Sequence, residues 1–458
     1  MFNSWGPSRY ESIIYENVSP KNMAAQLAGI SRSTRISHEP RTSQQATVTG
    51  VACGLVAPLV FFYVWWLLRS AQNDGIRRIY FMARDGQIFM KVALELIARW
   101  SLDIEVRYLY CSRESLLLPS YQKTGDFELH WITWGYASTI SIAEICRRLG
   151  ITAEELHPFL VDSGLAKYLS DSERPVERGD MQNIYDLLRD DGFEKLLREK
   201  SEPLFRVTLS YLEQELFFDG VPSVVADTGW RGSSQYALSA LIDKGGKRPG
   251  TGMKGYYLGL NREVHLFDND TMHSFLFDWR TTPRDYQLYY FICFEMLLSA
   301  NHGRTLGYQN QNGGAIIPVL GPTPGHHVNN IVEIHHLKTV EYARKAADNI
   351  PFEAFDDSLS EVARMLARAF INTPTTKEAE LYGEWPIASE MGEADFQPIS
   401  PPMSFGQFVR CAAGIDKIRG FWPQASLVRG KQRFLCWAYN RFLALGILDW
   451  YRSLLLRY

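Results

Sequence analysis

The chain has 458 residues, of which 46% are hydrophobic and 22% charged, a composition that is ordinary for a globular protein with a large core. Its 48 basic and 51 acidic residues give a net charge of −3, which argues against a general nucleic-acid-binding protein. The six cysteines form no C-x-x-C pair and no cluster with histidine at zinc spacing, so we expect reduced thiols and no structural zinc site.

The first 46 residues are predicted to form an N-terminal arm or linker, because the stretch SRSTRISHEPRTSQQ is strongly polar. The N-terminus also lacks the basic start and the apolar run of a secretory signal, which favours a cytoplasmic location.

Residues 51–68 carry no charge, and their 18-residue length is near the lower limit for a membrane-spanning helix. Gly54 and Pro58 interrupt this run, and proline is favoured in the first turn of a helix. We therefore predict a helix from Pro58 to about Gln72, with too few apolar residues to cross a bilayer. A helix buried in the core of the protein is the better interpretation.

An alternation of helices and strands begins at about Thr47 and predicts an α/β fold with a parallel-type sheet and flanking helices. Residues 123–218 look mostly helical and are predicted to be a large insertion that could cap a site. We expect an α/β core over residues 47–331 and a mostly helical C-terminal region over residues 332–458. The predicted strands cover Ile79–Met82, a stretch from about Glu105, Val221–Ala226 and about Gly255–Leu260.

Three of the predicted strands end in similar chemistry: an arginine lies within a few residues of an acid. In open α/β sheets, ligands bind outside the carboxyl ends of the strands. Arginine suits phosphate oxygens, and carboxylates suit sugar hydroxyls or a divalent cation. If the strands are neighbours, these groups form one site for a phosphorylated sugar; the alternative is that each pair is a local salt bridge. The three segments are Arg84–Gly86, Ser112–Glu114 and Asp227–Ser234.

The third segment lies within VVADTGWRGSSQ, Val224 to Gln235. A strand that leads through small residues to a helix N-terminus offers backbone N–H groups and the positive end of the helix dipole to a phosphate. The competing interpretation is that glycine and aspartate serve only the geometry of the turn.

Two further acidic motifs have alternative interpretations. Glu295 lies among apolar residues at helical spacing, with His302 and Arg304 at the predicted end of the helix. Glu295 could act as a base or a metal-linked acid and His302 or Arg304 could contact a phosphate, or Glu295 could simply pair with a neighbouring arginine. Asp268 and Asp270 form an Asp-x-Asp pair, which we interpret as a polar surface turn rather than a metal-binding motif.

Four stretches, in this order and spacing, together resemble the transferase half of bacterial dual-domain ribofuranosyltransferases, the glycan phosphoribosyltransferases, which are often labelled haloacid-dehalogenase-like. The resemblance covers about Thr47 to Tyr308 and implies a phosphoribosyltransferase-like fold. It does not extend to the phosphatase half of those proteins, since the first 46 residues contain no D-x-D-x-T start. The four stretches are the apolar run from Gly50 to Leu67, RRIYFMARDG with YLYCSRESLLLP, VVADTGWRGSSQ, and FEMLLSANHGRTLGY.

The resemblance implies a donor, phosphoribosyl pyrophosphate with Mg²⁺, and an acceptor hydroxyl on a lipid-linked glycan of a surface polysaccharide such as O-antigen or capsule. A separate phosphatase would remove the phosphate left on the ribose. Alternative functions in such a pathway are a haloacid-dehalogenase-like phosphatase, with Asp85 as nucleophile, and a nucleotide-sugar glycosyltransferase, with Asp268 and Asp270. The predicted catalytic residues are Asp227, Glu295 and His302; the predicted donor-phosphate-binding residues are Arg84, Asp85 (also the candidate Mg²⁺ ligand), Gly86, Arg113, Thr228, Gly229, Trp230, Arg231, Gly232, Ser233 and Ser234.

The C-terminal stretch, residues 434–458, is rich in Trp, Tyr and Leu and carries Arg441, Arg452 and Arg457. Interfacial helices have this composition, so we expect contact with the inner face of the membrane, where a lipid-linked acceptor would lie. Packing against the protein core is the alternative.

Overall fold

The computed structural model describes residues 6–133, 140–282, 288, 290–323, 325–388, 396–413, 415–416, 418 and 420–444. Its centre is a five-stranded sheet in the order β2-β1-β3-β4-β5, and every neighbouring pair is parallel. The predicted α/β fold with a parallel sheet is thus confirmed. The strands are β1 (Arg78–Met82), β2 (Glu105–Leu109), β3 (Ser223–Asp227), β4 (Lys254–Leu260) and β5 (Thr271–Asp278).

Helices cover both faces of the sheet, because alternate side chains of its apolar strands enter two separate cores. Ile79 and Phe81 of β1 pack on one face, and Tyr80 and Met82 pack on the other. The first face is covered by α4 (Ala57–Asn73), α5 (Gly86–Trp100) and α14 (His326–Asn349); the second is covered by α6 (Arg113–Ser120), α11 (Asp191–Gln214) and α12 (Ser233–Lys244).

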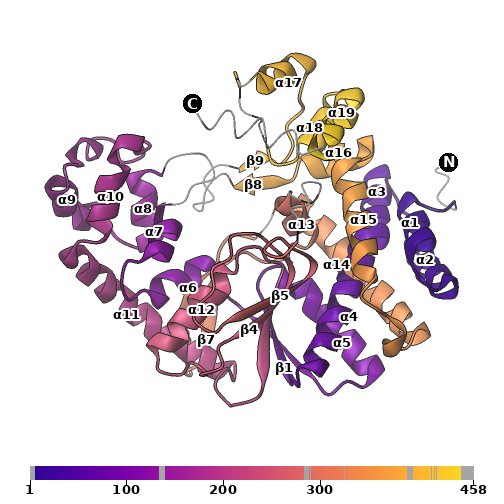
Figure 1. Ribbon diagram of the computed structural model, residues 1–458, viewed down its shortest axis with the longest axis horizontal. Helices are drawn as coiled ribbons and strands as arrows, with labels where there is room; N and C mark the ends of the chain where they lie inside the picture. The colour runs from indigo at the N-terminus through magenta and orange to yellow at the C-terminus, as the bar shows by residue number, and fades with distance from the viewer. Residues whose placement is uncertain are drawn as a thin grey trace.

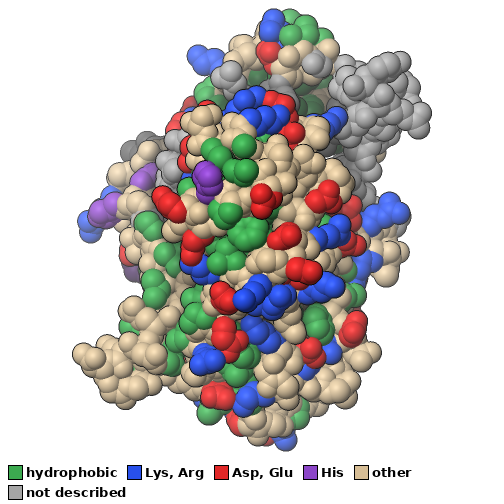
Figure 2. Space-filling model, turned by 90° about the vertical axis from the view of Figure 1, so that its left-hand side faces the viewer, with side chains coloured by type: hydrophobic (Ala, Val, Ile, Leu, Met, Phe, Trp, Pro, Cys, Tyr) green, Lys and Arg blue, Asp and Glu red, His purple; other side chains and the backbone are tan. Residues whose placement is uncertain are grey.

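The chain between β2 and β3 forms the helical insertion, which projects to one side of the sheet (Figure 1). On the face that the insertion presents in Figure 2, basic and acidic side chains are interspersed. After α6, its helices are α7 (Asp126–Thr133), α8 (Ile142–Leu149), α9 (Ala153–Asp162), α10 (Met181–Leu188) and α11, with short 3₁₀ turns at Ala166–Tyr168 and Arg178–Asp180.

Residues 9–35, expected to belong to an arm or linker, instead form α1 (Arg9–Asn17) and α2 (Lys21–Arg35), which pack on the core. The polar composition is misleading because α2 buries small hydroxyl residues. Ser31 is fully buried and donates to the Cys53 carbonyl at 2.9 Å.

The apolar segment forms one continuous helix, Ser43–Asn73, made of α3 (Ser43–Val51), a π-helical turn (Ala52–Val56) and α4. The prediction that a helix begins near Pro58 was wrong, because the wider π turn accommodates the proline without ending the helix. Gly54 lies against the Tyr10 ring, where a Cβ would come within 2.7 Å of the ring. Within the described residues this helix alone is long and apolar enough to cross a membrane, but 94% of its most apolar window is buried inside the protein.

The C-terminal part of the chain is mostly helical: α14 lies against the central sheet, and the elements from α16 onward lie at one end of the molecule (Figure 1). Two antiparallel hairpins, β6 (Thr305–Asn310) with β7 (Ile316–Leu320) and β8 (Pro386–Ala388) with β9 (Phe396–Pro398), were not predicted. The remaining elements are α13 (Phe291–Leu297), a 3₁₀ turn (Phe352–Ala354), α15 (Leu359–Asn372), α16 (Thr376–Gly383), α17 (Phe405–Ala412), α18 (Pro423–Arg429) and α19 (Arg433–Ala444).

Candidate functional site

The predicted site residues lie at the point where the strand order reverses. The chain runs outward from β1 to β2 and then returns past β1 to β3, so the switch point lies between β1 and β3. Crevices for ligands form there in open α/β sheets. The register pairs Phe81 with Ala226 and Met82 with Leu109, so the three strands end level with one another. The turns that hold Arg84, Arg113 and Thr228 therefore lie side by side.

Three carboxylates converge at this edge: Asp85 after β1, Asp227 at the end of β3 and Glu295 on α13. Burial, reinforced by the negative charges of Glu295 and Asp227, raises the pKa of Asp85 well above its usual value. Burial also raises the pKa of Asp227 to about 7, with Glu295 adding to the rise and the Thr228 backbone N–H and Arg113 opposing it. The site therefore concentrates three carboxyl groups, and the described residues compensate the ionised forms of Asp85 and Asp227 only partly.

Two arginines stand beside this acidic group. Arg84 and Arg113 are exposed, and no hydrogen bond or ion pair joins either guanidinium group to a described residue; the Arg84 carbonyl accepts from the Tyr108 hydroxyl at 3.1 Å. Their charges still reach the site, since Arg84 lowers the pKa of Asp85 and Arg113 lowers that of Asp227. The hypothesis of local Arg–acid salt bridges therefore fails for both, and their guanidinium groups are available to an anion.

The turn from β3 to α12 leaves many backbone donors unused. The Thr228 N–H bonds the Asp227 carboxylate at 2.8 Å, but the N–H groups of residues 229–235 donate to no described residue. No side chain caps α12, whose N-cap is Gly232. This run of N–H groups at a helix N-terminus, with the Ser233 and Ser234 hydroxyls beside it, suits a phosphate.

Glycine is required in this turn for close packing. Gly229 has φ +148°, and a Cβ there would lie 2.4 Å from the Gly259 carbonyl oxygen. Gly232 has φ +71°, and a Cβ there would meet the Met272 side chain at 2.2 Å. At the first turn, a Cβ on Gly86 would lie 2.9 Å from the Phe81 backbone. These glycines thus bring both helices close to the strand ends.

The Thr228 hydroxyl faces the Asp85 carboxyl. The side chain is 2% exposed, and a hydrogen bond from its hydroxyl lowers the pKa of Asp85, opposing the effect of burial. This bond is not well aligned, and the Oγ1 has no other partner among the described residues, so the hydroxyl remains able to bond a ligand.

The side chain of Trp230 packs beside the site, while its backbone N–H belongs to the run of unused donors. Its ring stacks on Phe291 at 4.6 Å and lies parallel to Phe277 at 5.9 Å. Its Nε1–H donates to Glu295 Oε1 at 3.0 Å. Trp230 thereby orients Glu295 and connects α13 to the turn after β3, a contact that the sequence spacing did not suggest.

His302 lies at the outer side of the site, next to β2. Its Nδ1 is 2.7 Å from the Gly303 carbonyl, which can only accept, so Nδ1 carries the proton and Nε2 accepts from the Tyr108 hydroxyl at 2.7 Å. Burial lowers the pKa of His302, and the Arg84 charge lowers it further. Both ring nitrogens already have partners, which favours the carboxylates over His302 as the base.

Arg231 faces the insertion. It contacts His130 Nε2 at 3.2 Å and pairs with Glu263 at 3.3 Å. Burial, with the charges of His130 and Arg231, lowers the pKa of His265 to about 4. Sequence reasoning missed His130, Glu263 and His265 because the fold brings them to the turn from distant segments.

The Asp-x-Asp pair divides into two different environments. Asp268 is exposed, whereas Asp270 is buried and bonds Ser239 at 2.6 Å, the Met253 N–H at 2.8 Å and Arg248 at 3.0 Å. The predicted surface turn is thus correct for Asp268 and wrong for Asp270. Asp270 also precedes β5, at the amino end of the sheet, so it lies at the opposite edge from the candidate site.

Among the described residues, no three His, Cys, Asp or Glu side chains are grouped in a way that would hold a metal ion by themselves. Comparison with protein-family models and with curated proteins finds no match to this sequence.

Proposed function

We propose that this protein transfers a phosphoribosyl group from phosphoribosyl pyrophosphate to a hydroxyl of a lipid-linked glycan, as a step in placing ribofuranose in a bacterial surface polysaccharide. The observation that carries the proposal is the meeting of partly compensated carboxylates, two arginines without ion pairs and a run of unused N–H donors at one switch point. A sugar phosphate presents the matching groups, since its hydroxyls suit carboxylates and its phosphate suits N–H donors.

The proposed arrangement of the donor follows from these groups. The terminal phosphate of the ribose binds the N–H groups of residues 229–235, and the Asp227 carboxylate accepts hydrogen bonds from the ribose hydroxyls. Arg84 and Arg113 bind the pyrophosphate. The buried Thr228 hydroxyl supplies one further donor at the centre of the site.

The reaction breaks the bond between the anomeric carbon and the pyrophosphate oxygen and forms a bond from that carbon to the acceptor oxygen. Negative charge grows on the departing pyrophosphate, where arginine donors stabilise it. The acceptor hydroxyl loses its proton to a carboxylate of the site. Asp227, with a pKa of about 7, and Glu295, held by Trp230, are the candidates for this proton transfer.

A divalent cation suits the site. Carboxylate oxygens such as those of Asp85 are ligands that Mg²⁺ accepts, and Mg²⁺ typically binds one or two carboxylates together with substrate phosphates and water. Mg²⁺ bound with the donor would supply positive charge beside the pyrophosphate and would favour the ionised form of Asp85.

Of the two alternative functions, the nucleotide-sugar transferase fits the site less well. A phosphatase with Asp85 as nucleophile would also need the ionised form of Asp85, which a bound Mg²⁺ would favour, so the test of the donor below must distinguish it from the transferase. A nucleotide-sugar transferase that held its metal on Asp270 would have to break bonds to Ser239, Met253 and Arg248.

Ligand-induced stabilisation tests the donor. Phosphoribosyl pyrophosphate with Mg²⁺, at about 100 times its dissociation constant, should stabilise the protein by roughly 2.7 kcal/mol, and nucleotide sugars should not. Stabilisation by a nucleotide sugar alone would overturn the proposal.

Transfer itself is tested with ³²P-labelled donor and lipid-linked glycan extracts. Asp227→Asn, which keeps the shape of the side chain, should lower transfer by about 100-fold or more, as the loss of a general base does. Asp268→Asn is the matched control, because Asp268 is exposed and distant from the switch point, and it should transfer normally. The product should retain the ribose phosphate until a separate phosphatase is added, and mass spectrometry of the product checks this.

A further inference from the structure

The helix α19 is apolar on two opposite faces. Cys436, Tyr439 and Leu443 are buried against the rest of the protein. Phe434 and Trp437 lie on the other side, 74% and 57% exposed, with their rings stacked at 5.7 Å. Large aromatic rings that are exposed to water do not stabilise a protein surface, so the Phe434–Trp437 face of α19 indicates an interaction surface.

Exposed cations accompany these aromatic rings. Lys431, Arg433 and Arg441 are exposed, and none has a carboxylate within ion-pair distance among the described residues. Arg441 lies over the Trp437 ring at 5.7 Å. Residues 405–444 contain seven Lys or Arg and a single acid, Asp416, whereas the whole chain has a net charge of −3. Positive charge is therefore concentrated in this part of the protein.

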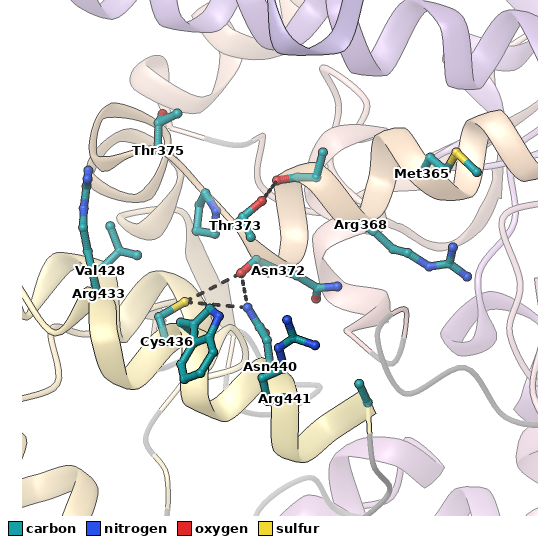
Figure 3. Close-up of a pocket in the computed structure, with 14 residues that line it drawn as sticks. Met365, Arg368, Asn372, Thr373, Thr375, Val428, Arg433, Cys436, Asn440 and Arg441 are labelled. Carbon is teal, nitrogen blue, oxygen red and sulfur yellow. Dashed lines mark hydrogen bonds between the residues drawn. The ribbon is translucent and has the colours of Figure 1, made fainter. Parts of the chain in front are cut away.

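A cavity of about 740 Å³ opens beside the same helix (Figure 3). Asn440 and Cys436 at its wall both donate to the Asn372 carbonyl, at 2.6 and 3.6 Å, which fixes α19 against the end of α15. Trp437 and Arg441 line the cavity and also belong to the exposed face of α19. Arg368, Arg433 and Arg441 line this cavity from different sides (Figure 3). Arg368 pairs with Glu361 at 3.1 Å, so Arg433 and Arg441 are the cations that face the aromatic rings without an ion pair among the described residues.

We infer that the α19 surface, formed by Lys431, Arg433, Phe434, Trp437, Arg441 and Phe442, docks on an anionic phospholipid bilayer. The aromatic rings enter the interfacial layer, where Trp side chains are favoured, and the cations meet lipid phosphates. The cavity between α15 and α19 receives one of these phosphate headgroups. Charge complementarity selects this partner, because Lys431, Arg433 and Arg441 have no ion pair among the described residues and therefore suit the phosphates of an anionic lipid surface. The inference does not depend on the proposed transferase activity.

Flotation with liposomes tests this surface, using the full-length protein and vesicles of phosphatidylcholine with or without phosphatidylglycerol. The wild-type protein should float with vesicles that contain phosphatidylglycerol and much less with phosphatidylcholine alone. Phe434→Ser with Trp437→Ser should reduce the bound fraction at least about tenfold, since two apolar groups are lost. Leu94→Ser with Leu337→Ser is the matched control, because these leucines are 52% and 65% exposed on other helices, and it should bind normally.

Charge reversal tests the role of the cations. Arg433→Glu with Arg441→Glu should reduce binding at least about tenfold, as each basic side chain near an anionic surface contributes. Lys195→Glu with Arg206→Glu, on exposed positions of α11, changes the net charge equally and should bind normally.

Four results would overturn the inference. The first is equal flotation of the α19 variants and their controls. The second is equal binding of the wild-type protein to neutral and anionic vesicles.

The third is thermal stabilisation of the wild-type protein by inorganic phosphate although it binds no vesicles, which would assign the cavity to a free anion. The fourth is a change of oligomeric state in the Phe434→Ser and Trp437→Ser protein although the wild-type protein binds no vesicles, which would assign the surface to a second copy of the chain.

Discussion

The two edges of the central sheet treat buried acids in opposite ways. At the amino end, Asp270 receives hydrogen bonds from Ser239 and the Met253 backbone and an ion pair from Arg248. At the carboxyl end, Asp85 and Asp227 lie near one another with raised pKa values, and the nearby arginines form no ion pair with them. The bonds of Asp270 include a paired cation, whereas Asp85 and Asp227 have hydrogen bonds from Thr228 but no ion pair, which marks a place where a ligand or a cation could complete the site.

The largest expected effect is at the amino end. Asp270→Asn removes the charge that Arg248 pairs with inside the protein, and we expect it to lower the free energy of unfolding by about 3 kcal/mol or more. Asp268→Asn, two residues away and exposed, should change stability by less than about 0.5 kcal/mol. Urea denaturation measures both. If Asp270→Asn were as stable as the wild type, Asp270 would not be the structural acid that its bonds indicate.

At the carboxyl end of the sheet, the expected change in the free energy of unfolding has the opposite sign and depends on pH. The pKa of Asp227 is raised to about 7, so the folded protein holds a proton that the unfolded chain releases near pH 4, and stability from this group falls as pH rises from about 4 to 7. Asp227→Asn removes this loss. It should therefore stabilise the unliganded protein at pH 8, and the gain should vanish near pH 4.

A pKa shift of one unit corresponds to about 1.4 kcal/mol of stability. The Asp227 carboxyl is partly open to water, so we expect Asp227→Asn to raise the free energy of unfolding at pH 8 by only about 1–2 kcal/mol. Thermal denaturation at several pH values measures it. Glu295→Gln provides a second test, because removing its charge should lower the pKa of Asp227. A lower stability of Asp227→Asn at pH 8 would show that this carboxylate is a structural group like Asp270.

The smallest expected effect concerns Thr228. Replacing its buried hydroxyl by a methyl group in Thr228→Val removes a group whose bond to Asp85 is not well aligned, so the unliganded protein should keep its stability or gain up to about 1 kcal/mol. The stabilisation by phosphoribosyl pyrophosphate should decrease in the same variant. Thermal denaturation with and without the donor separates the two effects. A clear loss of stability without ligand would mean that an ordered water already satisfies the hydroxyl.

The sequence predicted four of the five central strands, because short apolar runs such as Ile79–Met82 between polar turns are typical of buried parallel strands. It missed β5, Thr271–Asp278, at the edge of the sheet. It placed Asp85 and Asp227 correctly at strand ends. The helix before β1 was predicted to be buried but too short, because the π turn that accommodates Pro58 leaves no signal in the sequence. The first helices were missed because α2 buries residues such as Ser31 and Thr34, which composition counts as polar.

The side-chain partners within the site could not be predicted from the sequence. Trp230 was assigned to the donor phosphate, but the fold turns its indole toward Glu295 on a helix far along the chain. Arg231 was assigned to the same phosphate, and the insertion gives it His130 as a neighbour. Such contacts depend on tertiary packing rather than on local spacing. The predicted membrane-facing segment, residues 434–458, is only partly described, since residues 445–458 lie outside the described residues.

The buried helix Ser43–Asn73 has a consequence for the synthesis of the protein. Its main cover, α14, begins only at His326, so a ribosome makes the apolar helix long before the residues that enclose it. At about 5–20 residues per second, the nascent chain carries this helix without α14 for some tens of seconds. During that time it has the length and hydropathy of a membrane-spanning helix. Among the described elements that pack on it, α1, α2 and α5 are made earlier than α14. We therefore expect that a chain lacking residues 1–35 exposes more of this helix during translation, and binding of chaperones to the nascent chain measures this.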